Sequence, residues 1–356
     1  MMDLDSSAEN VALAELGEFR NGVNFGKGLK GSGLGLINVK DIFTDSPCVD
    51  FDALDLVDLA SSKGIDRYFV EEGDLFFVRS SVKRDGIGYV AHSNRKNNNA
   101  VHCGFVIRFR PNRQRVDYRF LTYALRSPES RDRIRNLSGG AAITNISQEA
   151  LSTLPVRVPP LPVQRRIAGI LSAYDELMEN SQRRIRILEA MARALYREWF
   201  VHFRFPGHET HPRVASPLGH IPKGWEVKPL FELTKVNYGK NLPTKNLVED
   251  GPYPVYGAAK IIGRHTEFTR EHRTIICGCR GSVGEMQITQ PRCFVTNNSF
   301  TFDPTNADNY FWLFHSLKER GLRDVIGGVA QPQITLEGIS SVELVTPPLP
   351  LRSRFQ

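Results

Sequence analysis

The hydrophobic positions of the chain follow the same order of patterns twice. Short apolar runs at 74–79 and 273–277 predict buried strands, and each is followed by a turn that contains glycine. Farther along, the apolar residues of 118–125 and of 310–317 recur at helical spacing, which predicts an amphipathic helix in each place. The pattern therefore predicts two copies of one α+β domain.

An ungapped repeat supports this duplication. Residues 139–167 match 327–355 at a constant offset of 188 positions, and both copies contain Pro-Pro-Leu-Pro, at 159–162 and at 347–350. A repeated unit fixes the architecture before any single element is assigned. Upstream of this repeat the offset drifts and the two sequences diverge. We therefore expect one scaffold that carries two different surfaces.

Between the copies, the sequence predicts one long helix. After Pro162 it contains no proline up to about Phe203, and Gly169 is its one weak helix former. About 40 residues at about 1.5 Å each would give a rod of about 60 Å. Apolar residues alternate at spacings of four and three, as in a coiled-coil seam that must be buried against another helix. The seam consists of Ile167, Leu171, Tyr174, Met178, Ile185, Leu188, Leu195 and Trp199.

These patterns divide the 356-residue chain, which is too long for a single core. We expect globular domains at 1–160 and 225–350, the helix at 161–205, a linker rich in Pro, Gly and His at 206–224, and the stub of a second helix at 351–356. The fold class is therefore α+β, with two similar globular domains separated by a long coiled-coil-type helix. Because only a stub of the second helix is present, we expect the seam to need cover from a partner or a second copy.

Composition favours an anionic partner. The formal net charge is +7, but 46 basic residues stand against 39 acidic ones, so any positive surface must be local. The amino terminus lacks the features of a signal peptide and no apolar run could span a bilayer, so we expect a cytoplasmic protein without membrane contact. The five cysteines lack zinc-site spacing and are expected to be reduced and mostly buried, and the histidines of 202–211 are expected to be loop residues, so no metal is predicted.

No catalytic motif is recognisable. The stretch 26–31 formally fits a dinucleotide-binding loop, but a strand is predicted after it where that motif requires a helix. Val158 and Thr346 precede the two Pro-Pro pairs, where an amino-methyltransferase needs Asn or Asp. A Walker A loop, a metal-dependent nuclease arrangement and a serine nucleophile elbow are also missing. We therefore expect recognition without catalysis and without a cofactor on this chain.

Basic and amide side chains in the loops of each copy are the candidates for contacting DNA. Loops on a rigid scaffold can reach base edges, where Arg suits guanine and Asn suits adenine, whereas Lys mainly neutralises phosphate. The candidates in the first copy are Lys27, Lys30, Arg79, Lys83, Arg84, Arg95, Lys96 and Asn98. Those in the second copy are Lys240, Lys245, Lys260, Arg264, Arg280, Asn297 and Asn298.

The segment 159–175, Pro-Pro-Leu-Pro-Val-Gln-Arg-Arg-Ile-Ala-Gly-Ile-Leu-Ser-Ala-Tyr-Asp, resembles the central conserved region of type I restriction-modification specificity subunits. Ile-Pro-Lys-Gly-Trp-Glu-Val at 221–227 and Gly-Gly-Val-Ala-Gln-Pro-Gln-Ile at 327–334 extend the resemblance over nearly the whole chain. It implies that each copy is a target recognition domain for one half of a split double-stranded DNA site, and that the long helix docks the modification subunit. It also implies that S-adenosylmethionine acts in that modification (methyltransferase) subunit, and that ATP and magnesium act in a separate restriction/translocase subunit.

Two other functions remain open. A noncatalytic coiled-coil scaffold with nonspecific DNA affinity would bind random and selected duplexes equally, whereas a recognition subunit should prefer a bipartite motif by several kcal/mol. A standalone nuclease or methyltransferase with an unrecognised site would turn over DNA in the presence of S-adenosylmethionine and magnesium.

Overall fold

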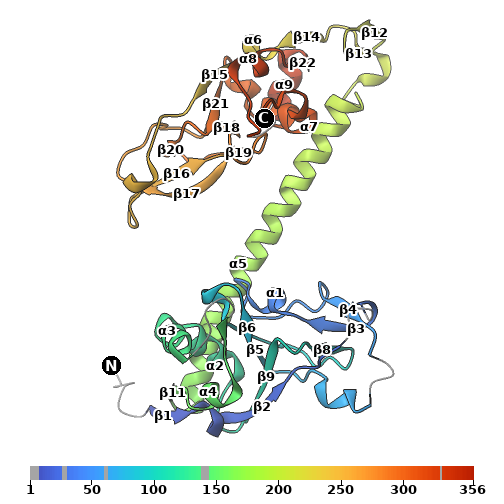
Figure 1. Cartoon of the computed structure of the whole chain (residues 1–356). Helices are drawn as coiled ribbons and strands as arrows, with labels where there is room; N and C mark the ends of the chain where they lie inside the picture. Colours follow the sequence, from blue (N-terminus) through green and yellow to red (C-terminus); the bar gives the residue numbers. More distant parts are fainter. Residues whose placement is uncertain (1–7, 26–29, 60–62, 138–143, 329–330) are drawn as a thin grey trace. The chain divides into compact units, whose positions relative to one another are not determined.

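The chain forms two compact units, Met1–Arg183 and Arg184–Gln356 (Figure 1). The structure is a computed structural model that describes residues 8–25, 30–59, 63–137, 144–328 and 331–356. Each unit combines one antiparallel sheet, one mixed sheet and several short helices, and each has its own hydrophobic core.

The first unit is built on a four-stranded antiparallel sheet in the order β2-β9-β5-β7 and a three-stranded sheet in the order β4-β3-β8. The strands of these sheets are β2 (Gly17–Asn21), β3 (Lys30–Ile37), β4 (Asp55–Val57), β5 (Leu75–Val78), β7 (Val90–His92), β8 (Ala100–His102) and β9 (Val106–Pro111). Two further pairs join β1 (Glu9–Ala12) to β11 (Pro155–Val158) and β6 (Ser80–Ser81) to β10 (Thr144–Asn145). The helices are α1 (Val39–Ile42), α2 (Tyr118–Arg126), α3 (Pro128–Leu137) and α4 (Gln148–Ser152).

Strand β5 lies between two cores, which explains why its sequence is apolar without alternation. Leu75 and Phe77 pack in a core shared with helices α2, α3 and α4, whereas Phe76 and Val78 pack in a second core shared with the three-stranded sheet. All four side chains are fully buried. A strand that is covered on both faces reads as a continuous hydrophobic run.

The second unit repeats this arrangement strand by strand. Its four-stranded sheet has the order β15-β21-β18-β19 and its three-stranded sheet has the order β17-β16-β20. In the three-stranded sheet β16 and β20 are parallel, as β3 and β8 are in the first unit. The strands are β14 (Glu226–Pro229), β15 (Thr234–Tyr238), β16 (Tyr253–Gly257), β17 (Lys260–His265), β18 (Ile275–Gly278), β19 (Met286–Ile288), β20 (Phe294–Val295), β21 (Ser299–Pro304) and β22 (Glu343–Thr346). The helices are α6 (Leu230–Leu233), α7 (Tyr310–Arg320), α8 (Leu336–Ser340) and α9 (Leu349–Phe355). The predicted duplication of an α+β fold is confirmed.

The matched sequence segments owe their similarity to a repeated helix start. Ser147 caps α4 by accepting a hydrogen bond from the amide of Ala150 (3.1 Å), and Thr335 caps α8 in the same way from Gly338 (3.0 Å). The preceding isoleucines, Ile146 and Ile334, are both buried. A buried apolar residue followed by a hydroxyl cap thus fixes the same corner of both units.

Helix α5 (Leu161–Tyr196) is 36 residues long and crosses from the first unit into the second. It becomes a π-helical turn at Arg197–Val201, earlier than the predicted end near 203 to 205. The helix cannot continue through Phe203, whose φ of 59° is left-handed. Residues 206–224, expected to be a linker, contain a hairpin of β12 (Arg213–Ser216) and β13 (Gly219–Pro222). Ile221 of this hairpin is buried in the core of the second unit.

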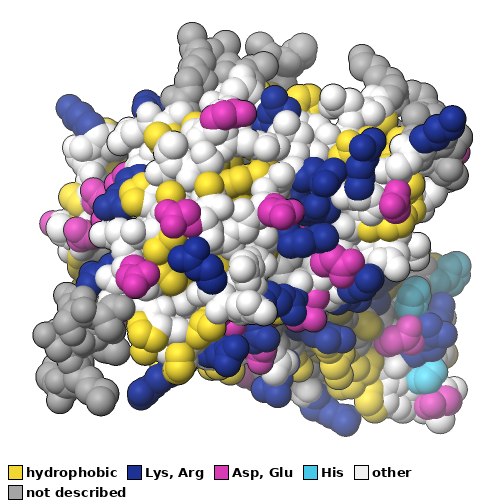
Figure 2. Space-filling view, turned by 90° about the horizontal axis from the view of Figure 1, so that it is seen from below, with side chains coloured by type: hydrophobic (Ala, Val, Ile, Leu, Met, Phe, Trp, Pro, Cys, Tyr) yellow, Lys and Arg dark blue, Asp and Glu magenta, His cyan; other side chains and the backbone are white. Residues whose placement is uncertain are grey.

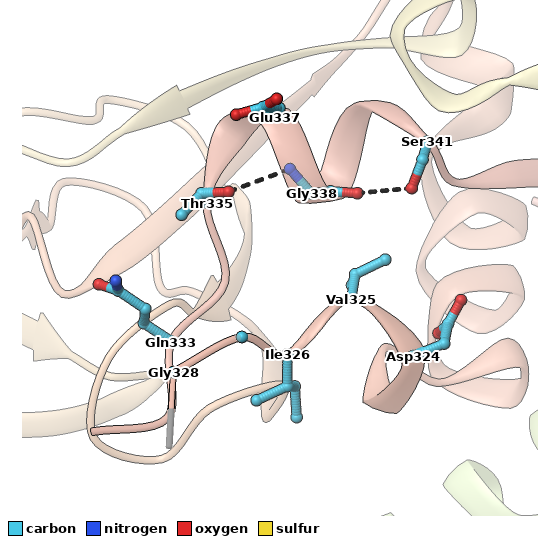
Figure 3. A pocket seen from close by; sticks show the side chains of 10 residues that line it. Asp324, Val325, Ile326, Gly328, Gln333, Thr335, Glu337, Gly338 and Ser341 are labelled. Atoms are coloured by element: carbon cyan, nitrogen blue, oxygen red, sulfur yellow. Dashed lines mark hydrogen bonds between the residues drawn. The ribbon is translucent and has the colours of Figure 1, made fainter. Parts of the chain in front are cut away.

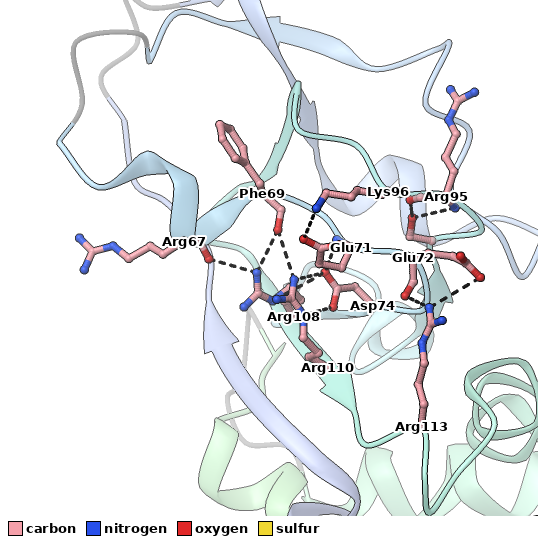
Figure 4. A network of polar contacts seen from close by, with 11 residues as sticks. Arg67, Phe69, Glu71, Glu72, Asp74, Arg95, Lys96, Arg108, Arg110 and Arg113 are labelled. Carbon is pink, nitrogen blue, oxygen red and sulfur yellow. Dashed lines mark hydrogen bonds and ion pairs between the residues drawn. The ribbon is translucent and has the colours of Figure 1, made fainter.

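An ion pair with a buried carboxylate ties the antiparallel sheet of the first unit together (Figure 4). Arg110 on β9 donates two hydrogen bonds to the carboxylate of Asp74, at 2.7 and 2.8 Å, and the Asp74 side chain is fully buried. In the second unit the charges are exchanged, because Asp303 on β21 accepts from Arg270 at 3.0 and 3.1 Å. That pair is more open, with the Asp303 side chain 41% exposed.

Replacing Asp74 should therefore destabilise the first unit strongly. Asp74→Asn leaves the guanidinium groups of Arg108 and Arg110 without their carboxylate, and we expect a loss of about 3–5 kcal/mol in the free energy of unfolding. Denaturant unfolding followed by circular dichroism measures it. The matched variant Asp303→Asn opens an exposed pair and should cost about 1 kcal/mol or less. Equal losses in the two variants would contradict this account.

Candidate nucleic-acid interface

In the first unit, three chain segments meet where β5 ends, and backbone hydrogen bonds hold them together. The amide of Arg79 donates to the carbonyl of Phe105 in the turn before β9 (2.8 Å), and the amide of Ile146 donates to the carbonyl of Arg79 (3.0 Å). Neither bond uses a side chain, so the side chains here can vary without breaking the frame. We call this place the first junction; its residues are Arg79, Ser80, Gly104, Phe105 and Asn145, of which Gly104 has no side chain.

The second unit has the same frame at the end of β18. The amide of Cys279 donates to the carbonyl of Asn298 (2.9 Å), and the amide of Ile334 donates to the carbonyl of Cys279 (3.0 Å). Lys240 joins this place because its carbonyl accepts from the amide of Asn297 (3.1 Å). We call it the second junction; its side chains come from Lys240, Cys279, Arg280, Asn297, Asn298 and Gln333.

One glycine in each unit lets a further strand approach the junction closely. A methyl group added to Gly22 would lie 1.9 Å from the carbonyl oxygen of Cys103, and one added to Gly239 would lie 2.2 Å from that of Thr296. No side chain fits at such distances, because the neighbouring atoms belong to the backbone. The closeness of this contact is therefore encoded by glycine in both copies.

The side chains at the two junctions differ although their frames agree. In the first, Phe105 is 63% exposed and the hydroxyl of Ser80 lies 2.5 Å from the amide oxygen of Asn145. In the second, Arg280 and Asn298 are exposed, and the Arg280 Nε lies 3.5 Å from the amide oxygen of Gln333. Arg280 makes no ion pair within the described residues. The second junction thus offers an unpaired cation beside three amides.

The charge of the second junction comes from its basic residues and not from its cysteine. Burial raises the pKa of the Cys279 thiol, so the thiol remains neutral near pH 7. On the face of the molecule seen in Figure 2, Lys and Arg side chains are interspersed with Asp and Glu. Positive and negative side chains of the described residues are therefore mixed on that face, without a separate basic patch.

Three of the predicted DNA-contacting residues also make contacts within their own unit. Arg95 pairs with Asp52 (2.8 Å) and Lys96 pairs with Glu71 (3.1 Å), as Figure 4 shows for the Lys96 pair. Arg264 donates to the backbone carbonyls of Gly251 and Pro252. These guanidinium and ammonium groups hold loops in place, which reduces their freedom to bind phosphate.

The other predicted residues fall into four groups. Arg79, Lys240, Arg280, Asn297 and Asn298 meet at the junctions, and Lys83 and Arg84 follow β6 with exposed side chains. Asn98 and Lys245 are exposed on segments that lead to the three-stranded sheets, and Lys260 is exposed at the start of β17. Lys27 and the side chain of Lys30 lie outside the described residues.

Phe105, Asn145 and Gln333 also lie at the junctions and are not among the predicted residues. The last two occupy the same position of the repeat, at the offset of 188, and both are amides. That coincidence was available in the sequence and could have identified them. Phe105 carried no such signal, because an aromatic residue beside a strand is usually part of the core.

A pocket beside the second junction is lined by residues of the segments before and within α8 (Figure 3). Asp324 and Glu337 both line it, and Asp324 is held by Arg320 at 2.7 Å. Gly327 and Gln333 close its wall through two backbone hydrogen bonds. Two carboxylates without a converging cation do not suit a phosphate group, so the pocket shapes the edge of the junction and is a poor anion site.

Within the described ranges, no three His, Cys, Asp or Glu side chains gather as ligands of a metal ion would. The same residues contain no helix with the length and hydropathy that crossing a bilayer requires. The five cysteines are free, and four of them are buried, as expected; Cys48 is half-buried.

Helix α5 carries a long row of exposed apolar side chains. Of the predicted seam, Tyr174 is 63% exposed and Leu188 is 62% exposed, whereas Trp199 packs against Phe200 and Phe355 in the core of the second unit. The exposed members of the predicted seam are Ile167, Leu171, Tyr174, Met178, Ile185, Leu188 and Leu195. Ile170, Leu177, Ile187 and Met191 are also exposed, which makes the apolar stripe wider than predicted.

The duplicated fold and its two unlike junctions define a two-domain binding protein, and comparisons with known proteins identify its family. The family described as "Type I restriction modification DNA specificity domain" matches residues 62–190 and 222–351. The chain therefore belongs to the type I restriction-modification specificity subunits. The family makes it a noncatalytic specificity subunit with two target recognition domains, which binds DNA and assembles with other subunits.

Individual relatives agree with this membership. The MjaIX specificity subunit of Methanocaldococcus jannaschii is 24% identical over 297 residues, covering 77% of this chain and 68% of that protein. The putative MjaX specificity subunit of the same organism is 24% identical over 319 residues, covering 85% and 74%. The crystal structure of a type I system S subunit from M. genitalium shares the fold, with a TM-score of 0.64 and 18% identity over all of this chain and 89% of that one.

Enlarging the glycine at the second junction should disturb the frame. Gly239→Ala forces apart two backbone segments, and we expect a loss of about 1–3 kcal/mol in unfolding free energy. The control is Gly169→Ala in α5, where nothing lies within 4 Å of the added methyl group, so the variant should gain about 0.5–1 kcal/mol. Thermal or denaturant unfolding compares the two. A Gly239→Ala protein as stable as the wild type would contradict the close approach.

Proposed function

We propose that this specificity subunit reads a split double-stranded DNA target, one part with each junction, and binds its modification subunit through α5. The observation that carries the proposal is the identical backbone frame with unlike polar side chains. A frame held by main-chain hydrogen bonds keeps its shape when the reading side chains change. Two domains of one scaffold can therefore recognise two different base sequences.

The side chains of the second junction suit contact with a DNA groove. Arg280 has no carboxylate partner among the described residues and can donate to a guanine edge, while Asn298 can bridge adenine. Lys240 is exposed beside them and suits a phosphate. In the first junction, Arg79 and Asn145 supply the corresponding groups. In this proposal the recognition domains comprise residues 1–160 and 225–350.

The exposed stripe of α5 suits a protein partner. Met178, Ile185 and Leu188 are each more than half exposed on a single helix, and a contiguous apolar surface of that kind marks an interaction site. The proposed partner is the modification subunit, which would carry S-adenosylmethionine, while a separate restriction subunit would use ATP and magnesium. This chain would then supply binding alone, in the cytoplasm.

Removing a base-reading side chain should change sequence preference. We expect Arg280→Ala and Asn298→Ala each to weaken binding of the preferred duplex by about 1–3 kcal/mol and to relax preference at one position. Lys240→Ala should weaken all duplexes alike and reduce the salt dependence by about one phosphate contact. Fluorescence anisotropy with selected and random duplexes at several salt concentrations measures both effects.

The control for these variants is Lys228→Ala, which removes a cation of the same unit that pairs with Glu226 away from the junction. It should leave base preference unchanged. If Arg280→Ala and Lys228→Ala bind every duplex with the same affinity as the wild type, the second junction does not read DNA. Equal affinity of the wild type for random and selected duplexes would instead support a nonspecific scaffold.

A charge on the exposed stripe of α5 should block the partner. Leu188→Asp would bury a carboxylate in the interface, so we expect at least tenfold weaker association with the modification subunit. The control, Arg186→Ala, changes a position outside the predicted seam. Sedimentation of mixtures with the modification subunit gives the affinity, and sedimentation of the chain alone tests self-association. Unchanged association of Leu188→Asp would refute docking through this stripe.

A further inference from the structure

An exposed aromatic side chain occupies the tip of the first junction. Outside α5, the two most exposed large apolar side chains of the described residues are Val82, at 81%, and Phe105, at 63%. Val82 follows β6 and Phe105 precedes β9, so both border the same junction. The described residues contribute no aromatic ring that contacts Phe105. The fold of the first unit therefore gains little from this phenyl group.

The backbone nevertheless holds Phe105 firmly. Its carbonyl accepts from the amide of Arg79, and the amide of Val106 donates to the carbonyl of Cys103 (2.9 Å), which closes the turn. Gly104, the other residue of this turn, has no side chain to cover the ring. An Arg79 guanidinium nitrogen lies 3.5 Å from the Gly104 carbonyl, so a cation lies beside the turn. A rigid turn thus presents an uncovered ring next to a positive charge.

The second unit places a polar residue at the same point. Phe105 and Asn298 both accept the hydrogen bond from the residue that follows the central strand, and each precedes the equivalent strand, β9 or β21. Asn298 is exposed and can hydrogen-bond to a base edge, whereas a phenyl ring cannot. If the two points face equivalent parts of the target, the first domain must read its part by an apolar contact.

We propose that Phe105 makes an apolar contact with a DNA base in the part of the target bound by the first domain. The inference rests on the proposed function, because it takes the first junction as a DNA-reading surface. The base can offer this contact in two ways, through its flat face when a base step is partly opened or through the C5-methyl group of thymine. Arg79, Ser80 and Asn145 would form a polar rim around the ring.

The test selects preferred duplexes from a random pool with the full chain. We expect the wild type to enrich a bipartite motif, and Phe105→Ala to lose preference at one or two positions of one part only. Binding of the enriched duplex should weaken about tenfold, the size expected for one base stacked on an aromatic ring. Asn298→Ala should lose preference in the other part. Phe231→Ala, which removes a phenylalanine 45% exposed on α6, is the matched control and should enrich the wild-type motif.

Two modified duplexes distinguish the sources of the contact. Deoxyuridine in place of thymine should weaken the wild type but not Phe105→Ala if the ring contacts the methyl group. A rise in 2-aminopurine fluorescence at the affected step, seen with the wild type and not with Phe105→Ala, would show that the ring opens the stack. Either result supports the proposal.

Failure of this inference can be distinguished from failure of the proposed function. If the wild type enriches a bipartite motif and Phe105→Ala enriches the same one with the same affinity, the ring does not contact a base, and the proposed function stands. If the wild type enriches no bipartite motif, the proposed function itself fails. Circular dichroism of Phe105→Ala should match that of the wild type, since the ring is exposed.

Discussion

Two backbone hydrogen bonds at the end of one buried strand hold the junction of each unit, which is its proposed recognition surface. At Arg79 and again at Cys279, the amide donates to the turn before the next strand and the carbonyl accepts from the segment before a short helix. Both groups would otherwise be unsatisfied beside the core, at a cost of about 1–3 kcal/mol each. Three segments distant in sequence are therefore obliged to meet, whatever side chains they carry.

The same freedom of side chains extends into the interior, where physical requirements are kept while residue types change. The sheet-spanning ion pair of Asp74 and Arg110 has its charges exchanged in Arg270 and Asp303. The cap at the helix start is Ser147 in one unit and Thr335 in the other. What the duplication preserves is charge balance, a hydroxyl cap and a glycine at close approach. Overall sequence similarity is lost much sooner than any of these.

The architecture could be predicted from the sequence because the repeated corner combines a buried isoleucine, a hydroxyl cap and Pro-Pro-Leu-Pro at a fixed offset. The contacts of individual loop residues could not be predicted in the same way. Arg95, Lys96 and Arg264 have the residue types of DNA contacts, yet their charges are used on Asp52, on Glu71 and on two carbonyls. Such local pairing depends on loop geometry, which residue type alone does not reveal. The exposure of Phe105 could not be predicted either, since its residue type indicates a core position and its turn exposes it.

The turns before β9 and β21 also affect how the protein can change by mutation. Phe105 in one unit and Asn298 in the other are exposed on a frame made by main-chain atoms. A change in one of these codons alters a group on the surface without removing a hydrogen bond that holds the fold. With the junctions reading DNA as proposed, mutation could change the target sequence of one half of the chain while the other half, and the helix between them, stay as they are.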